Sequence, residues 1–230
     1  MVIGNGMVAK KFESYKSNDK IILFASGVSN SKSTIEEAYK REISLLRDTI
    51  AINNKHILVY FSTGSIYDPG EKKSRYILHK KEVEKIIQSE CSRYYIFRVS
   101  NLAGKSSNPN TVLNFFVFHI LHGINFDLWK NATRNLIDID DMYKIVDYIL
   151  KKSIYQNQII NIANPENYTT EEIISTIETL WKTRASYISI PKGHSFNIDI
   201  SLITPIMEEL GIHFEKNYLI NLLRKYYYHP

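Results

Sequence analysis

Cysteine is almost absent from this chain, which limits how the fold can be stabilised. Cys91 is the only cysteine among 230 residues, so no disulfide can form within the chain. A lone thiol fits a reducing compartment, and we expect a cytoplasmic protein. Long apolar runs are lacking too, because the longest, at 112–121, is interrupted and too short to cross a bilayer. No basic segment followed by an apolar one opens the chain, so we expect no membrane association.

A concentrated basic face is also missing. The net charge is +5, but the lysines are spread in pairs such as Lys10-Lys11 and Lys72-Lys73. Spread charge of this kind is typical of a solvated surface that still tolerates anionic ligands. No nucleic-acid recognition motif is present, so we expect no nucleic-acid partner.

What the sequence does contain is an alternation of short apolar strands with amphipathic helices. This order predicts an α/β fold with a mainly parallel sheet and helices on both faces. Strands are expected at 1–3, 20–24, 58–61, 94–99, 126–129, 136–139 and 159–163. Helices are expected at 7–15, 33–53, 75–89, 111–122, 138–151, 170–181 and close to the end of the chain.

The interval between Gly6 and Ala25 is unusually short. It holds one helix and one strand, whereas a dinucleotide-binding half has a second strand, a helix and a third strand there. We therefore expect a trimmed sheet. The acidic residue that ends the second strand and binds the adenosine ribose is expected to be missing with it.

The helix expected from 33 to 53 has a plausible cap and an apolar stripe. Ser33 is the expected N-cap, with two glutamates in the first turn. The stripe predicted to be buried consists of Ile35, Tyr39, Ile43, Leu46 and Ile50.

Three residues suit proton transfer coupled to hydride transfer: Thr63, Tyr76 and Lys80. Thr63 follows a buried strand, at the end where open α/β sheets bind ligands, and Tyr76 and Lys80 are i and i+4 neighbours on a helix. A nearby ammonium stabilises a phenolate and makes a phenol useful near neutral pH. By itself the pair is more typical of a packed tyrosine and a solvated lysine.

The order of these motifs resembles the short-chain dehydrogenase/reductase superfamily, in particular its extended branch of nucleotide-sugar epimerases, dehydratases and reductases. The resemblance runs from Met1 to Ala163 in an atypically short form. It implies that Thr63, Tyr76 and Lys80 are the catalytic residues. It further implies a Rossmann-type sheet, an NAD(P) cofactor and a nucleotide-sugar substrate.

The resemblance also implies where the cofactor lies. Gly4-Asn5-Gly6-Met7 forms a glycine turn opening a helix, which lets the backbone approach a pyrophosphate. Ala25-Ser26-Gly27 resembles the family's small-residue segment beside the cofactor. The cofactor-binding residues expected in total are Gly4, Asn5, Gly6, Met7, Ala25, Ser26, Gly27, Ser62, Tyr76, Lys80 and Val99.

Substrate contacts are expected from Ser65, Ser100, Asn101 and Arg134. Ser100 and Asn101 lie in a segment resembling the family's R-x-x-N-x-x-G, and the Arg134 guanidinium suits a diphosphate. Gly64-Ser65 stands where the family's sugar dehydratases have an Asp-Glu pair, so dehydration is not expected. In the family, enzymes that both epimerise and reduce use a Cys and a His as an extra acid-base couple. Cys91 falls at the tail of a helix, away from the expected cleft, so this activity is not expected either. No metal site is expected, since His119 and His122 have no matched ligands.

Residues 1–165 are expected to form the NAD(P)-binding core, with 105–135 contributing in part to a substrate lobe completed by 166–230. Helices 35–52 and 74–89 resemble the pair through which the family dimerises, so a homodimer is expected. Tyr226-Tyr227-Tyr228 could either close the cleft or pack.

We expect an NAD(P)-dependent reductase of a nucleotide-activated keto-sugar. A nucleotide-sugar 4-epimerase with bound NAD uses the same residues and stays open as an alternative. A non-catalytic dinucleotide-binding sensor or scaffold is the alternative from another class. The missing acidic residue and the lysines at 10, 11 and 32 slightly favour NADP over NAD.

Overall fold

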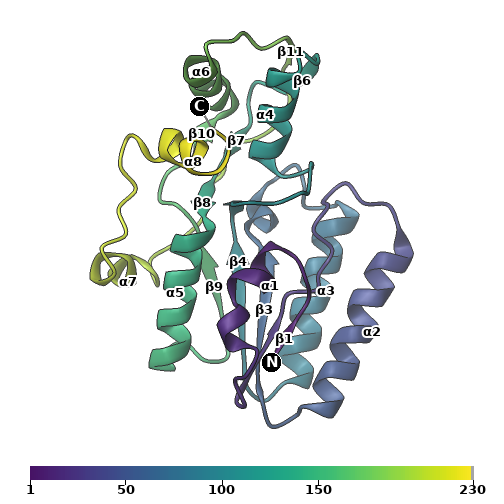
Figure 1. The fold of residues 1–230 in the computed structure, drawn as a ribbon. Coiled ribbons are helices and arrows are strands. Elements are labelled where there is room, and N and C mark those ends of the chain that lie inside the picture. Colours follow the sequence, from purple (N-terminus) through teal and green to yellow (C-terminus); the bar gives the residue numbers. More distant parts are fainter. Residues whose placement is uncertain (229–230) are drawn as a thin grey trace.

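The computed structural model describes residues 1–228 and is built on a parallel sheet of five strands (Figure 1). In spatial order these are β1 (Val2–Ile3), β2 (Ile21–Phe24), β3 (Ile57–Thr63), β4 (Tyr94–Val99) and β9 (Gln158–Ile162). Each neighbouring pair is parallel. The predicted α/β fold is therefore confirmed.

The trimming of the sheet is confirmed as well. Between β1 and β2 the chain forms only α1 (Met7–Lys11) and the 3-10 turn η1 (Glu13–Tyr15). Within residues 1–228, β1 is consequently an edge strand with no partner on its outer side.

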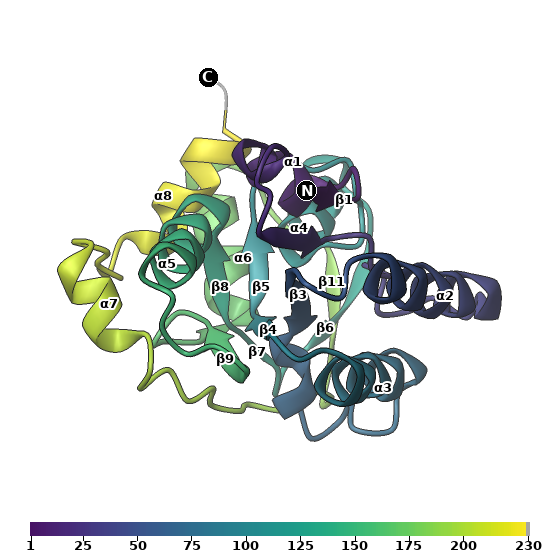
Figure 2. The ribbon, with the colours of Figure 1, turned by 90° about the horizontal axis from the view of Figure 1, so that it is seen from below.

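Helices cover both faces of the sheet. α2 (Glu36–Ile52) and α3 (Arg75–Glu90) pack on one face, against apolar side chains such as Phe24, Leu58 and Ile96. α5 (Ile139–Lys152) and the end of α1 pack on the other face, against Val59 and Phe97. Figure 2 shows α5 on one side of the strands and α2 and α3 on the opposite side.

The first crossover differs from the next two in handedness. The chain steps from β1 to β2, β3 and β4 in one direction across the sheet. α1 and η1 lie on the α5 face while α2 and α3 lie on the other, so the β1-α1-β2 connection has the opposite hand to its successors. Parallel crossovers are right-handed in about 98% of cases. The β4-to-β9 connection steps in the same direction and ends with α5 on the α1 face, so it has the same hand as the first.

The remaining elements form a smaller lobe and a flank. They are η2 (Gly64–Tyr67), β5 (Asn101–Ala103), α4 (Val112–Leu121), β6 (Phe126–Trp129), β7 (Thr133–Arg134), β8 (Leu136–Asp138), β10 (Tyr168–Thr169), α6 (Thr170–Trp181), β11 (Tyr187–Ile190), α7 (Thr204–Glu209) and α8 (Tyr218–Tyr226). α4, α6 and α8 share one apolar core, whereas α7 packs on the core of α5. α4 and β6 precede α6 by many residues, so the lobe is assembled from separate stretches of the chain.

The tyrosines at the end of α8 pack between elements. The Tyr226 hydroxyl donates to Asp138 at the start of α5 (2.6 Å), and Tyr227 donates to Asn114 of α4 (2.7 Å). Tyr228 meets the Trp181 ring edge-on. Of the two roles left open by the sequence, the structure shows packing.

Two predictions about α2 are wrong. The helix begins at Glu36 with Ile35 as N-cap, so Ser33 lies outside it. Ile35 is 60% exposed instead of buried. The buried positions are Tyr39, Glu42, Leu46 and Thr49. Glu42 can be buried because its carboxylate has enough hydrogen-bond partners.

No helix within residues 1–228 combines the length and the apolar character needed to cross a membrane.

Candidate active site

The residues predicted to act on a substrate gather where the parallel strands end. Thr63 is the last residue of β3 and pairs in register with Val99, the last residue of β4. Both are buried, as is Ser100 directly after β4. This edge is where open α/β sheets bind ligands.

Thr63 has a hydroxyl with one free hydrogen. Its oxygen accepts a hydrogen bond from the backbone N–H of Ser65 at 3.1 Å and so caps η2. A hydroxyl has one donor besides its acceptor positions, so Thr63 can still donate to a substrate oxygen. Ser65 itself is half-buried and serves here through its backbone.

Tyr76 and Lys80 lie together on the first turns of α3. The Ser74 side chain caps this helix by accepting from the Ile77 N–H at 3.3 Å, which fixes its start just before Tyr76. The Lys80 ammonium lies 5.7 Å from the centre of the Tyr76 ring. Lys80 is only 3% exposed, so its charge acts in a site nearly closed to water.

The Lys80 ammonium is held from behind by two side chains. It donates to the Tyr60 hydroxyl at 2.8 Å and to the Glu42 carboxylate at 3.1 Å. Tyr60 comes from β3 and Glu42 from α2. An ammonium has three donors, so one remains for a ligand.

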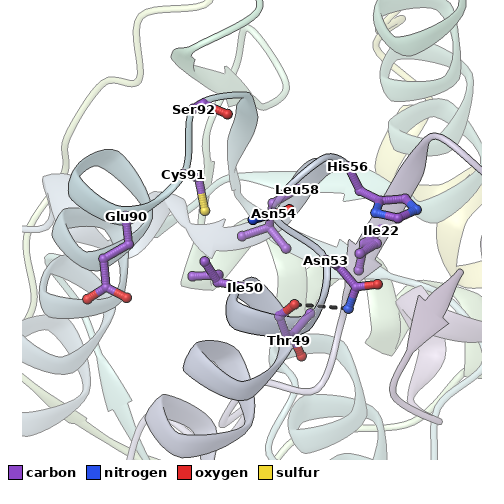
Figure 3. A pocket seen from close by; sticks show the side chains of 10 residues that line it. All are labelled: Ile22, Thr49, Ile50, Asn53, Asn54, His56, Leu58, Glu90, Cys91 and Ser92. Atoms are coloured by element: carbon purple, nitrogen blue, oxygen red, sulfur yellow. Dashed lines mark hydrogen bonds between the residues drawn. The ribbon is translucent and has the colours of Figure 1, made fainter.

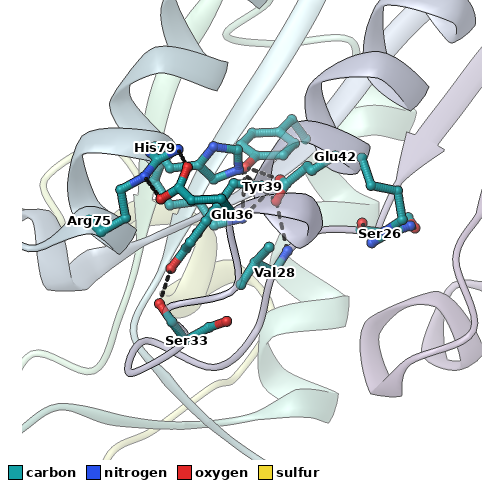
Figure 4. A network of polar contacts seen from close by, with 11 residues as sticks. Ser26, Val28, Ser33, Glu36, Tyr39, Glu42, Arg75 and His79 are labelled. Carbon is teal, nitrogen blue, oxygen red and sulfur yellow. Dashed lines mark hydrogen bonds and ion pairs between the residues drawn. The ribbon is translucent and has the colours of Figure 1, made fainter.

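Glu42 is the centre of this buried network (Figure 4). Besides Lys80, its carboxylate accepts from the Tyr60 hydroxyl (2.8 Å) and from the backbone N–H of Val28 (2.7 Å), and it bonds to Nε2 of His79 (2.8 Å). Its side chain is fully buried. Four partners satisfy a group that is otherwise costly to bury.

The network keeps Glu42 charged. Burial acts to raise its pKa, but the Lys80 charge, the His79 hydrogen bond and the Val28 N–H outweigh burial and lower the pKa to about 2. Burial and the neighbouring carboxylate raise the pKa of Tyr60 well above its ordinary value, so Tyr60 stays a neutral phenol. The positive charge of Lys80 is thus balanced by one fixed negative charge.

Sequence analysis missed Glu42. The only signal was its spacing, three residues after Tyr39 and four before Leu46, which places it on the buried face of α2. A charged residue at such a position is a sign of a buried partner.

The cofactor-binding residues predicted from the two glycine segments lie side by side. Gly4 has φ of +125°, and a Cβ there would lie 2.4 Å from the carbonyl oxygen of Ala25. Only glycine fits that approach. Ser26 is bonded by Arg41, whose guanidinium donates to its hydroxyl and its carbonyl oxygen.

Gly27 is packed against the ion pair itself. A Cβ at this position would lie 2.7 Å from the Lys80 ammonium and 2.8 Å from the Glu42 carboxylate. The small residue expected for close approach of a ligand also makes room for the Lys80-Glu42 pair.

The glycine turn opens to solvent. Gly4, Asn5 and Gly6 are exposed, and Met7 is half-buried. A Cβ at Gly6 would meet no atom within 4 Å, so the space beside this residue is free.

Ser62 is turned away from this group. Its hydroxyl donates at 2.6 Å to Glu84, which also binds Arg98 at 2.6 Å. Arg98 in turn donates to the Tyr67 hydroxyl at 3.0 Å and so anchors η2. The Ser62 hydroxyl therefore serves a structural network, and the prediction that Ser62 contacts the cofactor rests on its backbone alone.

The predicted substrate residues have different surroundings. The Ser100 hydroxyl is buried and has no hydrogen-bond partner among the described residues, so it is available to a polar ligand. Asn101 donates to the carbonyl oxygen of Asn135 at 2.9 Å. Arg134 donates to the carbonyl oxygen of Thr133, and burial lowers its pKa despite the nearby charges of Asp68 and Glu71.

An irregular segment that sequence analysis did not single out, residues 191–200, runs past the same edge. The Ile198 side chain comes within 3.0 Å of where a Gly64 Cβ would lie. The segment is held by Asn167 and Asn161, which donate to the carbonyl oxygens of Phe196 and Asp199 at 2.8 Å. It lacks a hydrophobic period, so no sequence pattern predicted its place.

A small cavity between α2 and α3 lies away from this site (Figure 3). Its walls include Asn53, His56 and Cys91, which precede or flank the beginnings of β3 and β4. That is the opposite end of the strands from Thr63. Burial raises the pKa of Cys91 to about 11, so its thiol is a poor nucleophile.

Residues 5–163 match the family model described as the NAD dependent epimerase/dehydratase family. The chain belongs to this family. The match covers the glycine turn from Asn5 onward, the Thr63/Tyr76/Lys80 group and every strand of the sheet except β1. The resemblance seen in the sequence is confirmed, and the expectation of an NAD(P)-dependent enzyme of the oxidoreductase and epimerase type holds at the level of the family.

Solved structures show the same fold. The chain is 15% identical to dTDP-glucose 4,6-dehydratase from Bacillus anthracis str. Ames in complex with NAD, with a TM-score of 0.68 over 95% of this chain and 77% of the other. RMD from Pseudomonas aeruginosa complexed with NADPH has 13% identity and a TM-score of 0.67 over 97% and 96%. UDP-glucose 4-epimerase from Thermus thermophilus in complex with NAD has 14% identity and a TM-score of 0.66 over 94% and 80%. No curated protein is similar enough in sequence to count as a match.

The chemistry of the residues at this edge suits part of an NAD(P) molecule. The close approach of Gly4 to Ala25, the free donor of Lys80 and the unpartnered Ser100 hydroxyl are features of a site for a polar ligand. Gly4, Ala25 and Ser100 directly follow the carboxyl ends of β1, β2 and β4, and Lys80 lies one turn after Tyr76 on α3.

Proposed function

We propose that the protein is an NAD(P)-dependent reductase of a nucleotide-activated keto-sugar. The observation that carries the proposal is the Lys80 ammonium, fixed by Tyr60 and Glu42, 5.7 Å from the ring of Tyr76. The family and the sugar nucleotides named for two similar structures support the substrate class. Gly64-Ser65, in place of an acid-base pair, argues against dehydration.

In the proposed reaction Tyr76 supplies the proton. Its hydroxyl donates to the oxygen of the keto group, and the Lys80 ammonium stabilises the phenolate that remains. The Thr63 hydroxyl donates a hydrogen bond to the same oxygen and holds it within reach of Tyr76. NAD(P)H, when bound, supplies the hydride that the carbonyl carbon takes up.

The cofactor is NAD or NADP, and the preference for NADP stays a prediction. Lys11 already donates to Asp140 at 2.5 Å, and the Lys32 ammonium lies 6.0 Å from the centre of the Phe115 ring. Lys10 is exposed and remains the clearest support for a phosphate-bearing cofactor.

The test is a titration of the purified protein with NADH, NADPH, NAD and NADP, together with analysis of nucleotide retained from expression. Binding of reduced cofactor with none retained supports the reductase, whereas retained NAD supports a 4-epimerase. Binding of none of the four contradicts both enzymes and leaves a scaffold.

The chemistry is tested by Tyr76→Phe. We expect reduction of nucleotide keto-sugars to fall by at least about 100-fold while reduced cofactor still binds. Tyr187→Phe, on β11 in the lobe, is the control and should keep full activity. Equal activity of Tyr76→Phe and the unaltered protein would contradict the proposed role.

A further inference from the structure

The sheet contains only one side of a dinucleotide-binding fold. Such folds consist of two mononucleotide-binding halves, and the dinucleotide lies across the point where the strand order reverses. Here the order runs β1-β2-β3-β4-β9 without reversal, and within residues 1–228 no strand lies outside β1. The strand order reverses nowhere in this part of the chain, although the connections that leave β1 and β2 go to opposite faces of the sheet.

The half that remains is the one that carries the chemistry. Tyr76, Lys80, Gly27 and Ser100 all lie on β2 to β4 or on the segments that follow these strands. They include an ammonium with one free donor and a buried hydroxyl without a partner among the described residues. Each is a group that a nicotinamide ribose or a substrate hydroxyl can bind.

The missing half is the one that would hold adenosine. The second strand, whose closing carboxylate binds the adenosine ribose, does not exist between β1 and β2. α1 spans fewer than two turns, so its dipole is a weak anchor for a diphosphate. Arg41 follows this edge on α2, but it is exposed and already bonded to Ser26.

We propose that the site binds only the nicotinamide mononucleotide half of the cofactor, so that reduced nicotinamide mononucleotide binds about as tightly as NADH. This inference rests on the proposed function, because it assumes that the site beside Tyr76 holds a nicotinamide. It follows that the adenosine half stays in solvent. Any preference for NADPH then comes from general attraction to lysines and disappears at high salt.

The experiment compares dissociation constants for NADH and reduced nicotinamide mononucleotide, both followed by nicotinamide fluorescence. We expect the two constants to agree within about threefold, less than 1 kcal/mol. We also expect ADP-ribose, which carries the adenosine and the diphosphate, to leave bound NADH in place at millimolar concentration. Binding of NADH that is more than about threefold tighter, or displacement by ADP-ribose, would overturn the inference.

Two variants locate the contacts. Lys80→Met should weaken both ligands by the same factor, since the lost contact belongs to the shared half. Arg41→Ala should change neither constant. Loss of NADH affinity alone in Arg41→Ala would show an adenosine contact and contradict the inference.

The outcomes separate this inference from the proposed function. If NADH binds tightly and the mononucleotide does not, the proposed function stands and the inference fails, for instance because a second copy of the chain completes the site. If neither binds, both fail.

Discussion

Glu42 is a buried charge with four partners. They are Val28 in a loop, Tyr60 on β3, and His79 and Lys80 on α3. Replacing it with glutamine leaves the Lys80 ammonium buried without a counter-charge and turns one acceptor into a donor. Removing one partner of such a pair typically costs about 3 kcal/mol. We therefore expect Glu42→Gln to lower the free energy of unfolding by that amount in chemical denaturation. Glu13→Gln, which breaks an exposed ion pair with Lys16, should leave it unchanged.

The same residue predicts a pH dependence. Folding lowers the pKa of Glu42 from 4.5 to about 2, so its ionised form stabilises the fold above about pH 4.5. This contribution is lost as the pH falls through about 2. The difference in unfolding free energy between the unaltered protein and Glu42→Gln should be constant near neutral pH and shrink between these two values. A difference that persists unchanged at pH 2 would show that the carboxylate charge is not responsible.

Gly27 predicts a steric effect beside the same pair. Gly27→Ala places a methyl group within 3 Å of the Lys80 ammonium and the Glu42 carboxylate, and a shift of either buried group would strain their hydrogen bonds. We expect destabilisation of about 1 to 3 kcal/mol, the usual cost of overpacking. Gly6→Ala is the matched control, because its methyl group meets nothing within 4 Å. Equal thermal stability of the two variants would contradict the packing described for Gly27.

At the scale of elements, helix ends provide a paired test. Thr169 caps α6 with a full capping box, in which its hydroxyl accepts from the Glu172 N–H and Glu172 accepts from the Thr169 N–H. Thr169→Ala should cost about 1 kcal/mol in unfolding free energy. Ser33→Ala should cost less, since α2 begins three residues later and the Ser33 hydroxyl accepts only a long hydrogen bond from the Ile35 N–H at 3.4 Å. A larger loss for Ser33→Ala than for Thr169→Ala would reverse the assignment of caps.

Elements with a strong local pattern could be predicted from the sequence. β4 and β6 have the predicted bounds, and α3 buries Ile77, Val83 and Ile87 as its period indicates. Thr63, Tyr76 and Lys80 were predicted from strand and helix spacing together with the resemblance to the family, and their catalytic role stays a prediction. Their placement at one edge then follows from a parallel sheet.

What could not be predicted depends on contacts between distant segments. Glu42 is buried because Val28, Tyr60 and Lys80 reach it from other parts of the chain, and no local period shows that. The segment at 191–200 is irregular and is positioned by hydrogen bonds from Asn161 and Asn167. Side-chain partners across such separations leave no trace in a window of neighbouring residues.

At the scale of the whole molecule, the predicted homodimer through α2 and α3 remains to be tested. Both helices carry exposed apolar side chains, with Leu78 of α3 52% exposed. If these helices form the contact, Leu78→Glu should convert a dimer into a monomer in sedimentation velocity. Leu202→Glu, at another exposed leucine, should leave the dimer intact. A monomeric unaltered protein would contradict the prediction.

The opposite hand of the β1-α1-β2 connection has a consequence for protein engineering. A strand-helix-strand module inserted between Tyr15 and Lys20 could pair with the open side of β1, with α1 keeping its present face. The chain would then leave β1 outward before returning to β2, and the first crossover would take the hand of the β2-α2-β3 connection. The inserted module that changes the hand of this crossover would also supply the strands on which a dinucleotide-binding fold places adenosine.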